Sequence, residues 1–351
     1  MAVMMENRIE YVPIWIRLGE LNMELYCLGG VNDNNNNNNN NSNNNNNNIN
    51  THGERVKSFN ELLIKASALL PPRPVDASLS DELLHIYTSG TTGLPKAAVI
   101  RGYRALFMCG GVGAACRMVP SDVVYNALPL YHSNGGLALT GNTIRIGTTL
   151  VIRKKFSASR YFEDCYRHNV TVVNYIGETC RYLLATQRGQ FDRQHCIRVA
   201  TGNGLRASIW KEFQERFNIP LCVEFYGSTE GNANMVNTVG KVGAVGFNSV
   251  LCPCAFPIKL VKIDADTGDI LRGSNGLAIG AGTGEVGMLV GKVKSDEIHK
   301  FDGYINATDT AKKVARDVFT HGDSAFMTGD MLVQDEEGFY YFQVMLIHTY
   351  P

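Results

Sequence analysis

An excess of charge of one sign is absent from this 351-residue sequence, which carries 33 lysines and arginines against 33 aspartates and glutamates. Proteins that bind nucleic acids through the phosphate backbone usually carry an excess of basic residues. The composition therefore gives no argument for a nucleic-acid partner. With 44% hydrophobic residues, the chain can form one large domain or two of ordinary size.

The sequence also lacks a convincing membrane span and a secretory leader. Its longest uncharged segment outside an asparagine tract, residues 123–144, contains a proline, a histidine and three asparagines, which would be costly in hydrocarbon. Nine cysteines are present without a C-x-x-C pair, and the spacing of Cys252 and Cys254 is too short for a zinc site. These features favour reduced thiols in the cytosol, most of them acting as small apolar residues of the core.

An asparagine tract interrupts the first part of the chain. From Asn34 to Asn50, fifteen of the seventeen residues are asparagine. Such a tract has no apolar face to bury and cannot offset the entropy lost on ordering, so we expect it to be disordered. Before the tract, only the segment from Tyr11 to Leu28 has the apolar content of a helix.

A loop rich in glycine and hydroxyl groups lies between two short apolar runs, residues 83–87 and 97–100. It consists of Tyr87, Thr88, Ser89, Gly90, Thr91, Thr92, Gly93, Leu94, Pro95 and Lys96. Glycines free the backbone, and neutral donors with one lysine can wrap a polyphosphate. The loop is not of the G-x-x-x-x-G-K-[ST] type, because Pro95 stands where the second glycine would be. We interpret it as a phosphate-binding loop and not as an ordinary polar turn.

Two later motifs could complete a nucleotide site. The first follows a strand-like run, residues 221–223, and consists of Glu224, Phe225, Tyr226, Gly227, Ser228, Thr229 and Glu230. Its aromatic ring could stack on a base, its hydroxyls could contact a phosphate, and its carboxylate could hold Mg²⁺ through oxygen. The second motif ends in Asp330, a carboxylate of the kind that accepts hydrogen bonds from ribose hydroxyls. Together with the loop, these motifs predict a nucleotide site.

Strand-like and helix-like runs alternate after residue 83. The predicted strands are 123–128, 149–153, 171–175, 197–201 and 221–225, and the predicted helices are 158–167, 178–187 and 207–217. Ser157 is the expected N-cap of the first helix. This alternation predicts right-handed βαβ crossovers and a largely parallel sheet, hence an α/β fold.

Two regions depart from this pattern. Residues 101–118 are ambiguous, because Gly110, Gly111 and Gly113 each weaken a helix by roughly 1 kcal/mol relative to alanine. From residue 257 onward, segments 257–263, 286–290 and 330–342 resemble antiparallel strands with turns at Gly268 and Gly338.

Residues 202–207 also match the motif of a different class of protein. Gly202, Asn203, Gly204, Leu205, Arg206 and Ala207 match G-x-G-x-x-A between a strand and a helix. Glu224 lies twenty residues beyond Gly204, as in a dinucleotide-binding fingerprint. An NAD-dependent oxidoreductase is therefore a distant alternative. It explains neither the loop before Lys96 nor the residues from Tyr226 to Glu230.

The three nucleotide motifs resemble those of the adenylate-forming superfamily of acyl-CoA synthetases, which bind AMP. Other segments look like the fatty acid transport protein branch, also called very long-chain acyl-CoA synthetases. These segments are 150–160, 175–178, 180–184, 202–206, 246–249 and 301–304. The resemblance is nearly continuous from about Leu83 to Phe342, and a weaker piece covers residues 6–19.

The resemblance implies ATP-dependent activation of a fatty acid through an acyl-adenylate, followed by thioester formation with CoA. The loop from Thr88 to Lys96 would hold the triphosphate, with Lys96 on the leaving pyrophosphate. Thr88 and Glu230 would hold Mg²⁺, and Thr229 would contact the α-phosphate.

The remaining roles concern the nucleoside and the acyl group. Gly202, Asn203, Gly204 and Leu205 would frame the adenine together with Tyr226, and Gly227 and Ser228 would complete that turn. Asp330 would contact the ribose, and His132 would lie beside the acyl carboxylate. Lys96, Thr229, Glu230 and His132 are the predicted catalytic residues.

The resemblance also implies a domain organisation. We expect an AMP-binding α/β subdomain over 81–240 and a β-rich subdomain with a distorted antiparallel barrel over 241–342. A remnant of a first α/β subdomain (1–30) and an asparagine-rich insert with a linker (31–80) precede them, and a non-family tail (343–351) follows.

Family members continue at this tail with a hinge and a small C-terminal domain, so we expect impaired activity. The alternative is a catalytically incompetent nucleotide- or acyl-binding remnant, or an incomplete gene model. Expected ligands are a long-chain fatty acid and CoA. The family works at the endoplasmic reticulum or plasma membrane with its catalytic domain in the cytosol, whereas this chain alone is expected to be soluble.

Overall fold

A computed structural model describes residues 2–3, 25–27, 76–88, 94–253 and 256–343. The asparagine tract, the tail after residue 343 and five predicted loop residues lie outside the described part; the five are Ser89, Gly90, Thr91, Thr92 and Gly93. Within the described part, no helix has both the length and the apolar character needed to cross a membrane.

A parallel sheet forms the centre of the chain. Its strands are β5 (Val123–Asn126), β6 (Thr149–Ile152), β7 (Val172–Ile176), β8 (Val199–Asn203) and β9 (Cys222–Tyr226). They pair in the order β9-β8-β7-β5-β6, and all these pairs are parallel. The connecting helices are α5 (Tyr161–Arg167), α6 (Gly177–Leu184) and α7 (Ala207–Phe217). The predicted parallel α/β sheet is confirmed.

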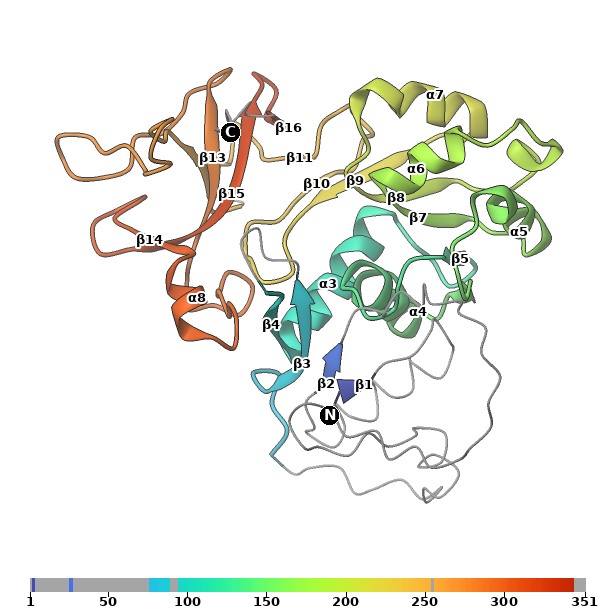
Figure 1. Cartoon of the computed structure of the whole chain (residues 1–351), viewed down its shortest axis with the longest axis horizontal. Helices are drawn as coiled ribbons and strands as arrows, with labels where there is room; N and C mark the ends of the chain where they lie inside the picture. Colours follow the sequence, from blue (N-terminus) through green and yellow to red (C-terminus); the bar gives the residue numbers. More distant parts are fainter. Residues whose placement is uncertain (1, 4–24, 28–75, 89–93, 254–255, 344–351) are drawn as a thin grey trace, which may run out of the picture.

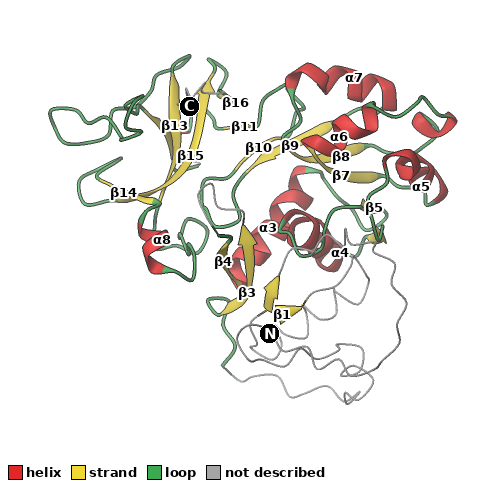
Figure 2. Ribbon diagram, viewed as in Figure 1, coloured by secondary structure: helices red, strands yellow, loops and turns green. Residues whose placement is uncertain are grey.

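Both faces of this sheet are covered. Val173, Ala200 and Cys222 pack in one core cluster with aromatic residues of α7, whereas Val172 and Val199 pack in another on the opposite side. Figure 2 shows α6 and α7 on one side of the strands, with α3 (Gly102–Ala115) and α4 (Gly141–Ile146) on the other. Because successive strand residues point to opposite faces, a sheet covered on both sides needs continuous apolar runs, which is the observed pattern.

Antiparallel strands extend the sheet beyond β9. They are β10 (Met235–Asn237), β11 (Gly246–Phe247), β16 (Phe339–Phe342), β15 (Ser324–Gln334), β13 (Val286–Lys292) and β12 (Ile258–Val261), in that order, with β14 (Val314–Arg316) beside β15. In Figure 1, β13 to β16, coloured orange to red, are separated from the helix-covered parallel strands by β10 and β11. The antiparallel character is confirmed. Closure into a barrel is not, because β10 pairs with β9 and the described strands form an open path ending at β12.

A smaller sheet carries the predicted phosphate loop. β3 (Glu82–Thr88) and β4 (Lys96–Arg101) are antiparallel, and Thr88 pairs with Lys96 across the ends of the two strands. β2 (Leu25–Cys27) adds to β3 in parallel, and β1 (Ala2–Val3) adds to β2. The predicted helix over residues 11–28 is therefore wrong at Leu25–Cys27, where the segment satisfies the edge of β3 instead. The rest of that predicted helix lies outside the described residues.

Two local predictions are settled by packing. Residues 102–115 form helix α3 despite their glycines. A side chain at Gly113 would collide with Asn142 and Ile146, so this glycine allows α3 to pack closely against α4. Ser157 occupies the predicted N-cap position, with an extended backbone, before the short 3₁₀ turn η2 (Ala158–Arg160), but its side chain makes no capping hydrogen bond. Its hydroxyl instead lies 3.4 Å from that of Ser159.

The cysteine prediction is confirmed for the buried thiols. These are Cys109, Cys116, Cys165, Cys180 and Cys222, all free and all within the core. The remaining short elements are the π-helix η1 (Asn134–Thr140), the 3₁₀ turn η3 (Gln190–Asp192) and helix α8 (Ala307–Ala311).

Candidate active site

A cavity of about 580 Å³ lies at the carboxyl ends of the parallel strands β8 and β9, beside the end of β3. Ligands of open α/β sheets bind at this edge, since the loops that follow the strands converge there. Most of the described predicted site residues line it: Thr88, Lys96, His132, Asn203, Tyr226, Gly227, Ser228, Thr229 and Glu230. The structure therefore brings together motifs that are more than 140 residues apart in the chain.

The two predicted magnesium ligands converge on one phenol. Tyr304 Oη donates a 2.8 Å hydrogen bond to Glu230 Oε1. Burial and the Glu230 carboxylate raise the pKa of Tyr304, whereas contact with the Thr88 hydroxyl lowers it, so the phenol lies between the two. Thr88 Oγ1 also donates to the carbonyl of Lys96 at 3.3 Å.

The Thr88 hydroxyl and the Glu230 carboxylate are suitable ligands for a hard cation, but they are too few to hold one alone. Carboxylate and hydroxyl oxygens are the ligand types that Mg²⁺ prefers. Among the described residues, no group of three or more histidine, cysteine, aspartate or glutamate side chains could hold a metal alone. A magnesium ion at Thr88 and Glu230 would therefore need water and phosphate oxygens to complete its octahedron.

Lys96 is paired within the protein. Its ammonium lies 3.0 Å from Asp309 Oδ1, on helix α8, and both side chains are 21% exposed. The same ammonium lies over the ring of Tyr304, 5.6 Å from its centroid. The predicted pyrophosphate ligand is thus at the cavity wall with its charge already matched.

The predicted adenine loop is shaped by its backbone and supported by Glu224. Gly204 has φ of +82°, a left-handed conformation that favours glycine. Glu224 is 1% exposed and accepts hydrogen bonds from the N–H groups of Gly204 and Leu205, the latter at 3.1 Å. Its other oxygen accepts one from Tyr175 Oη at 2.5 Å. Burial raises the pKa of Glu224 to about 7, against the lowering effect of these bonds.

This geometry bears on the dinucleotide alternative. A dinucleotide-binding site needs a carboxylate that faces the ribose. Glu224 instead holds the loop through one oxygen, which accepts from Gly204 and Leu205, and its other oxygen accepts from Tyr175. The sequence spacing therefore has a structural explanation that requires no NAD.

Tyr226 and Asp330 are neighbours, as one nucleotide site would require. Tyr226 Oη donates a 2.6 Å hydrogen bond to Asp330 Oδ2, and burial and the nearby carboxylate raise its pKa. Thr328, two residues before Asp330, lines the cavity. Lys313 also lines it, donating to the carbonyl of Thr328 at 3.4 Å. Lys313 is a cavity cation that the sequence analysis missed.

His132 lies on a loop tied to both nucleotide motifs. Its ring opens to the cavity, and burial by surrounding protein lowers its pKa. Its Nδ1 accepts from the N–H of Asn134 at 3.4 Å, which implies that the neutral ring carries its proton on Nε2. Ser133 Oγ lies 3.1 Å from Thr229 Oγ1, and Asn134 donates to Asn203 Oδ1 at 3.2 Å.

The other wall of the cavity is apolar. Phe107, Met108, Val112 and Ala115 line it from α3, at spacings that put them on one side of the helix. Met235 and other residues of β9 and β10 also line the cavity, and Val223 and Val236 of these strands pack in one cluster with Val112 and Ala115. The cavity lining therefore combines the polar motif residues with an apolar set, Phe107, Met108, Val112, Ala115 and Met235, which we call the apolar arm.

Arg104 supports the motif around Glu230 and was missed by the sequence analysis. It is 3% exposed, and its guanidinium donates to the carbonyls of Ser228 at 3.1 Å, Thr229 at 3.4 Å and Gly231. Burial lowers its pKa, and the charges of Asp302 and Glu230 oppose this effect. The sequence contained an indication of this role. Arg104 begins an uncharged stretch, residues 105–116, and such a stretch is typical of a segment packed against the rest of the protein.

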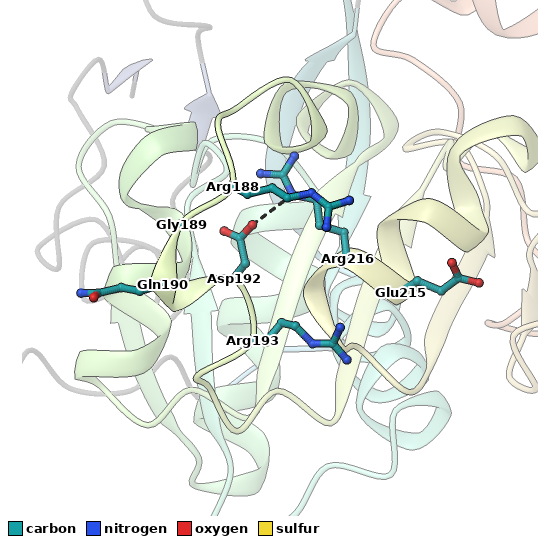
Figure 3. Close-up of a pocket in the computed structure, with 7 residues that line it drawn as sticks. All are labelled: Arg188, Gly189, Gln190, Asp192, Arg193, Glu215 and Arg216. Carbon is teal, nitrogen blue, oxygen red and sulfur yellow. Dashed lines mark hydrogen bonds and ion pairs between the residues drawn. The ribbon is translucent and has the colours of Figure 1, made fainter.

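A second depression, of about 390 Å³, lies at the opposite edge of the sheet (Figure 3). Its lining comprises Arg188, Gly189, Gln190, Asp192, Arg193, Glu215 and Arg216. Arg216 Nε lies 3.0 Å from Asp192 Oδ2, and Nη1 donates to the carbonyl of Leu184 at 2.6 Å. Arg216 thus joins the end of α6 to α7, which is a structural role.

Comparison with known proteins settles the family. The AMP-binding enzyme family matches residues 29–289. The chain belongs to the AMP-binding enzyme family. Long-chain fatty acid transport protein 1 from Homo sapiens is 41% identical over 374 residues, and its Bos taurus counterpart is 48% identical over 376 residues. Both alignments cover 97% of this chain and 58% of the relative.

The predicted resemblance to the fatty acid transport protein branch of this family is confirmed by these identities. The chain spans little more than half the length of those relatives. Membership in an AMP-binding family also argues against the NAD-dependent alternative.

Solved AMP-binding-family structures share the fold. ATP-bound MatB from Rhodopseudomonas palustris matches with a TM-score of 0.63 at 23% identity, over 83% of this chain and 52% of that one. A variant of o-succinylbenzoate CoA synthetase from Bacillus subtilis, bound to a product analogue, matches with a TM-score of 0.70 at 19% identity. That match covers 97% of this chain and 67% of the other. The predicted fold class is confirmed.

Proposed function

We propose that the protein is an AMP-forming fatty acid–CoA ligase for long-chain or very long-chain fatty acids. In the first step a carboxylate oxygen attacks the α-phosphorus of ATP, which forms an acyl-adenylate and releases pyrophosphate. In the second step the CoA thiol attacks the acyl carbonyl, which forms the thioester and releases AMP. The observation that carries this proposal is one cavity in which the nucleotide motifs meet an apolar arm.

The polar end has the chemistry that a nucleotide requires. Thr88 and Thr229 line the cavity and carry hydroxyl groups of the kind that contact a phosphate. Lys96 and Lys313 bring positive charge to the same space. In the proposed site the adenine lies against residues 202–205 and Tyr226, the ribose faces Asp330, and Thr229 contacts the α-phosphate.

Charge neutralisation is the main chemical need of the first step, because negative charge develops on the phosphates. Thr88 and Glu230 would hold Mg²⁺ together with phosphate oxygens, and the ion would neutralise part of that charge. Lys96 would neutralise the leaving pyrophosphate. Arg104 holds the carbonyls of Ser228, Thr229 and Gly231, so the Glu230 motif is positioned before a ligand arrives.

The acyl group would extend from His132 into the apolar arm. A neutral His132 can donate from Nε2 to the carboxylate without adding a buried charge. Each methylene removed from water in the arm contributes about 0.8 kcal/mol to binding. This favours long chains over acetate. CoA as the second substrate, association with a membrane, and the division into subdomains at 81–240 and 241–342 belong to the same proposal.

The test is exchange of labelled pyrophosphate into ATP, which reports the first step alone. We expect exchange that depends on oleate and is far slower with acetate. Glu230→Gln should abolish it, whereas Glu212→Gln, on the exposed face of α7, should leave it unchanged. Equal exchange with acetate and oleate, or none with any fatty acid, would contradict the proposal.

A further inference from the structure

The segment that pairs with Lys96 is held rigidly beside it. Val99 donates to the carbonyl of Gly303 at 3.0 Å, and Ile305 donates to that of Ala97 at 3.0 Å, so residues 303–305 run along β4. Within the segment, Thr310 Oγ1 accepts from the N–H of Tyr304 at 2.9 Å. Asp309 therefore reaches Lys96 from a fixed backbone.

Asn306 fixes the start of helix α8. Its side chain accepts hydrogen bonds from the N–H groups of Thr308 at 2.9 Å and Asp309 at 3.4 Å. The 3.0 Å ion pair between Lys96 and Asp309 thus costs little additional ordering on the Asp309 side. The family-like segment 301–304, which received no role from the sequence, leads directly into this arrangement.

The pair has a consequence for ligand binding. One lysine ammonium cannot keep its full contact with Asp309 while it neutralises a triphosphate. A nucleotide that recruits Lys96 must therefore break the ion pair, and the observed affinity is reduced by the stability of that pair. The affinity of a ligand without β- and γ-phosphates is not reduced in this way, because Lys96 can keep its ion pair with Asp309 when such a ligand binds.

We propose that Asp309 competes with the triphosphate for Lys96. This competition weakens ATP binding relative to AMP binding, and Lys96 pairs with Asp309 again when pyrophosphate leaves. This inference rests on the proposed function, since it assigns Lys96 to the pyrophosphate. Asp309 is a positioning residue here: it acts through Lys96 and touches no reacting atom.

Calorimetric titration with Mg·ATP and with AMP tests this inference on four variants of the chain: Asp309→Asn, Asp309→Ser, Lys96→Ala, and Lys96→Ala with Asp309→Asn. An ion pair that solvent still reaches, as this one at 21% exposure of both side chains, is worth up to about 1 kcal/mol, so either Asp309 variant should bind ATP about two- to fivefold more tightly. AMP affinity should not change. In the Lys96→Ala background, Asp309→Asn should have no effect on ATP affinity.

A charge control separates contact from long-range repulsion. Asp266→Asn removes a carboxylate from an exposed turn and should leave ATP affinity unchanged. Tightening by Asp309→Asn of equal size with and without Lys96 would mean simple repulsion and would overturn the proposal. Unchanged or weaker ATP binding by both folded Asp309 variants would overturn it too. A parent protein that binds neither nucleotide would refute the proposed function itself.

Discussion

Glu224 provides the sharpest pH-dependent prediction. The carboxyl is 1% exposed, and burial raises its pKa from 4.5 to about 7. The groups that face it are the phenol of Tyr175, the thiols of Cys180 and Cys222, and two backbone N–H groups. The change to test is Glu224→Gln, because a glutamine carbonyl can accept both N–H bonds while the side chain carries no charge to bury.

The sign of the effect follows from proton binding. Between pH 4.5 and about 7 the folded protein holds a proton on Glu224 that the unfolded chain has lost. The stability contributed by this proton is complete below the unfolded pKa and is lost as the pH rises through the folded pKa. Integrated from about pH 5.5 to about pH 8.5, the loss amounts to about 2 kcal/mol.

Urea unfolding measured at both pH values gives the free energy of unfolding for each protein. We expect the parent to lose about 2 kcal/mol more than Glu224→Gln over this pH interval. The exposed variant Glu212→Gln should retain the pH dependence of the parent. Identical pH dependence in the parent and Glu224→Gln would refute the assignment of a raised pKa to the buried carboxyl beneath the nucleotide loop.

Three further predictions concern the cavity. Lys96→Ala or Glu230→Ala should each weaken Mg·ATP binding about tenfold or more in calorimetry, since each removes a charge-assisted contact; unchanged affinity would exclude the residue from the site. Tyr304→Phe should weaken ATP binding about fivefold with Mg²⁺ present and little without it, because it frees the Glu230 carboxylate that the phenol orients; equal effects in both conditions would contradict this. Arg104→Met should lower the free energy of unfolding by about 3 kcal/mol in urea titrations, since it strands buried carbonyls; a loss below about 0.5 kcal/mol would contradict this.

The sheet could be predicted because its local and long-range requirements agree. β5 to β9 are apolar on both faces and alternate with helices, so periodicity and burial point to one arrangement. Helix α7 has the predicted bounds, and its end coincides with Asn218 in a left-handed conformation. Helix α3 was ambiguous because its glycines disfavour a helix locally, whereas the close approach of Asn142, twenty-nine residues away in the chain, favours glycine at position 113.

The nucleotide motifs could be predicted because each is contiguous, so a short stretch of sequence carries its chemistry. The contacts that position them could not. Lys96 meets Asp309, and Glu230 meets Tyr304, across large separations in the chain that no periodicity encodes. Whether the antiparallel strands close into a barrel could not be predicted for a similar reason, since the pairing of β10 with β9 depends on contacts between distant segments.

The central claim is that one cavity holds a nucleotide and a fatty acyl chain together. Titration of the parent chain with oleoyl sulfamoyl adenosine, a stable mimic of an oleoyl-adenylate, tests it most directly. Burial of only a few methylenes at about 0.8 kcal/mol each predicts binding at least about a hundredfold tighter than that of AMP, in competition with Mg·ATP. A mimic that binds no more tightly than AMP, or that binds without displacing ATP, would contradict the account.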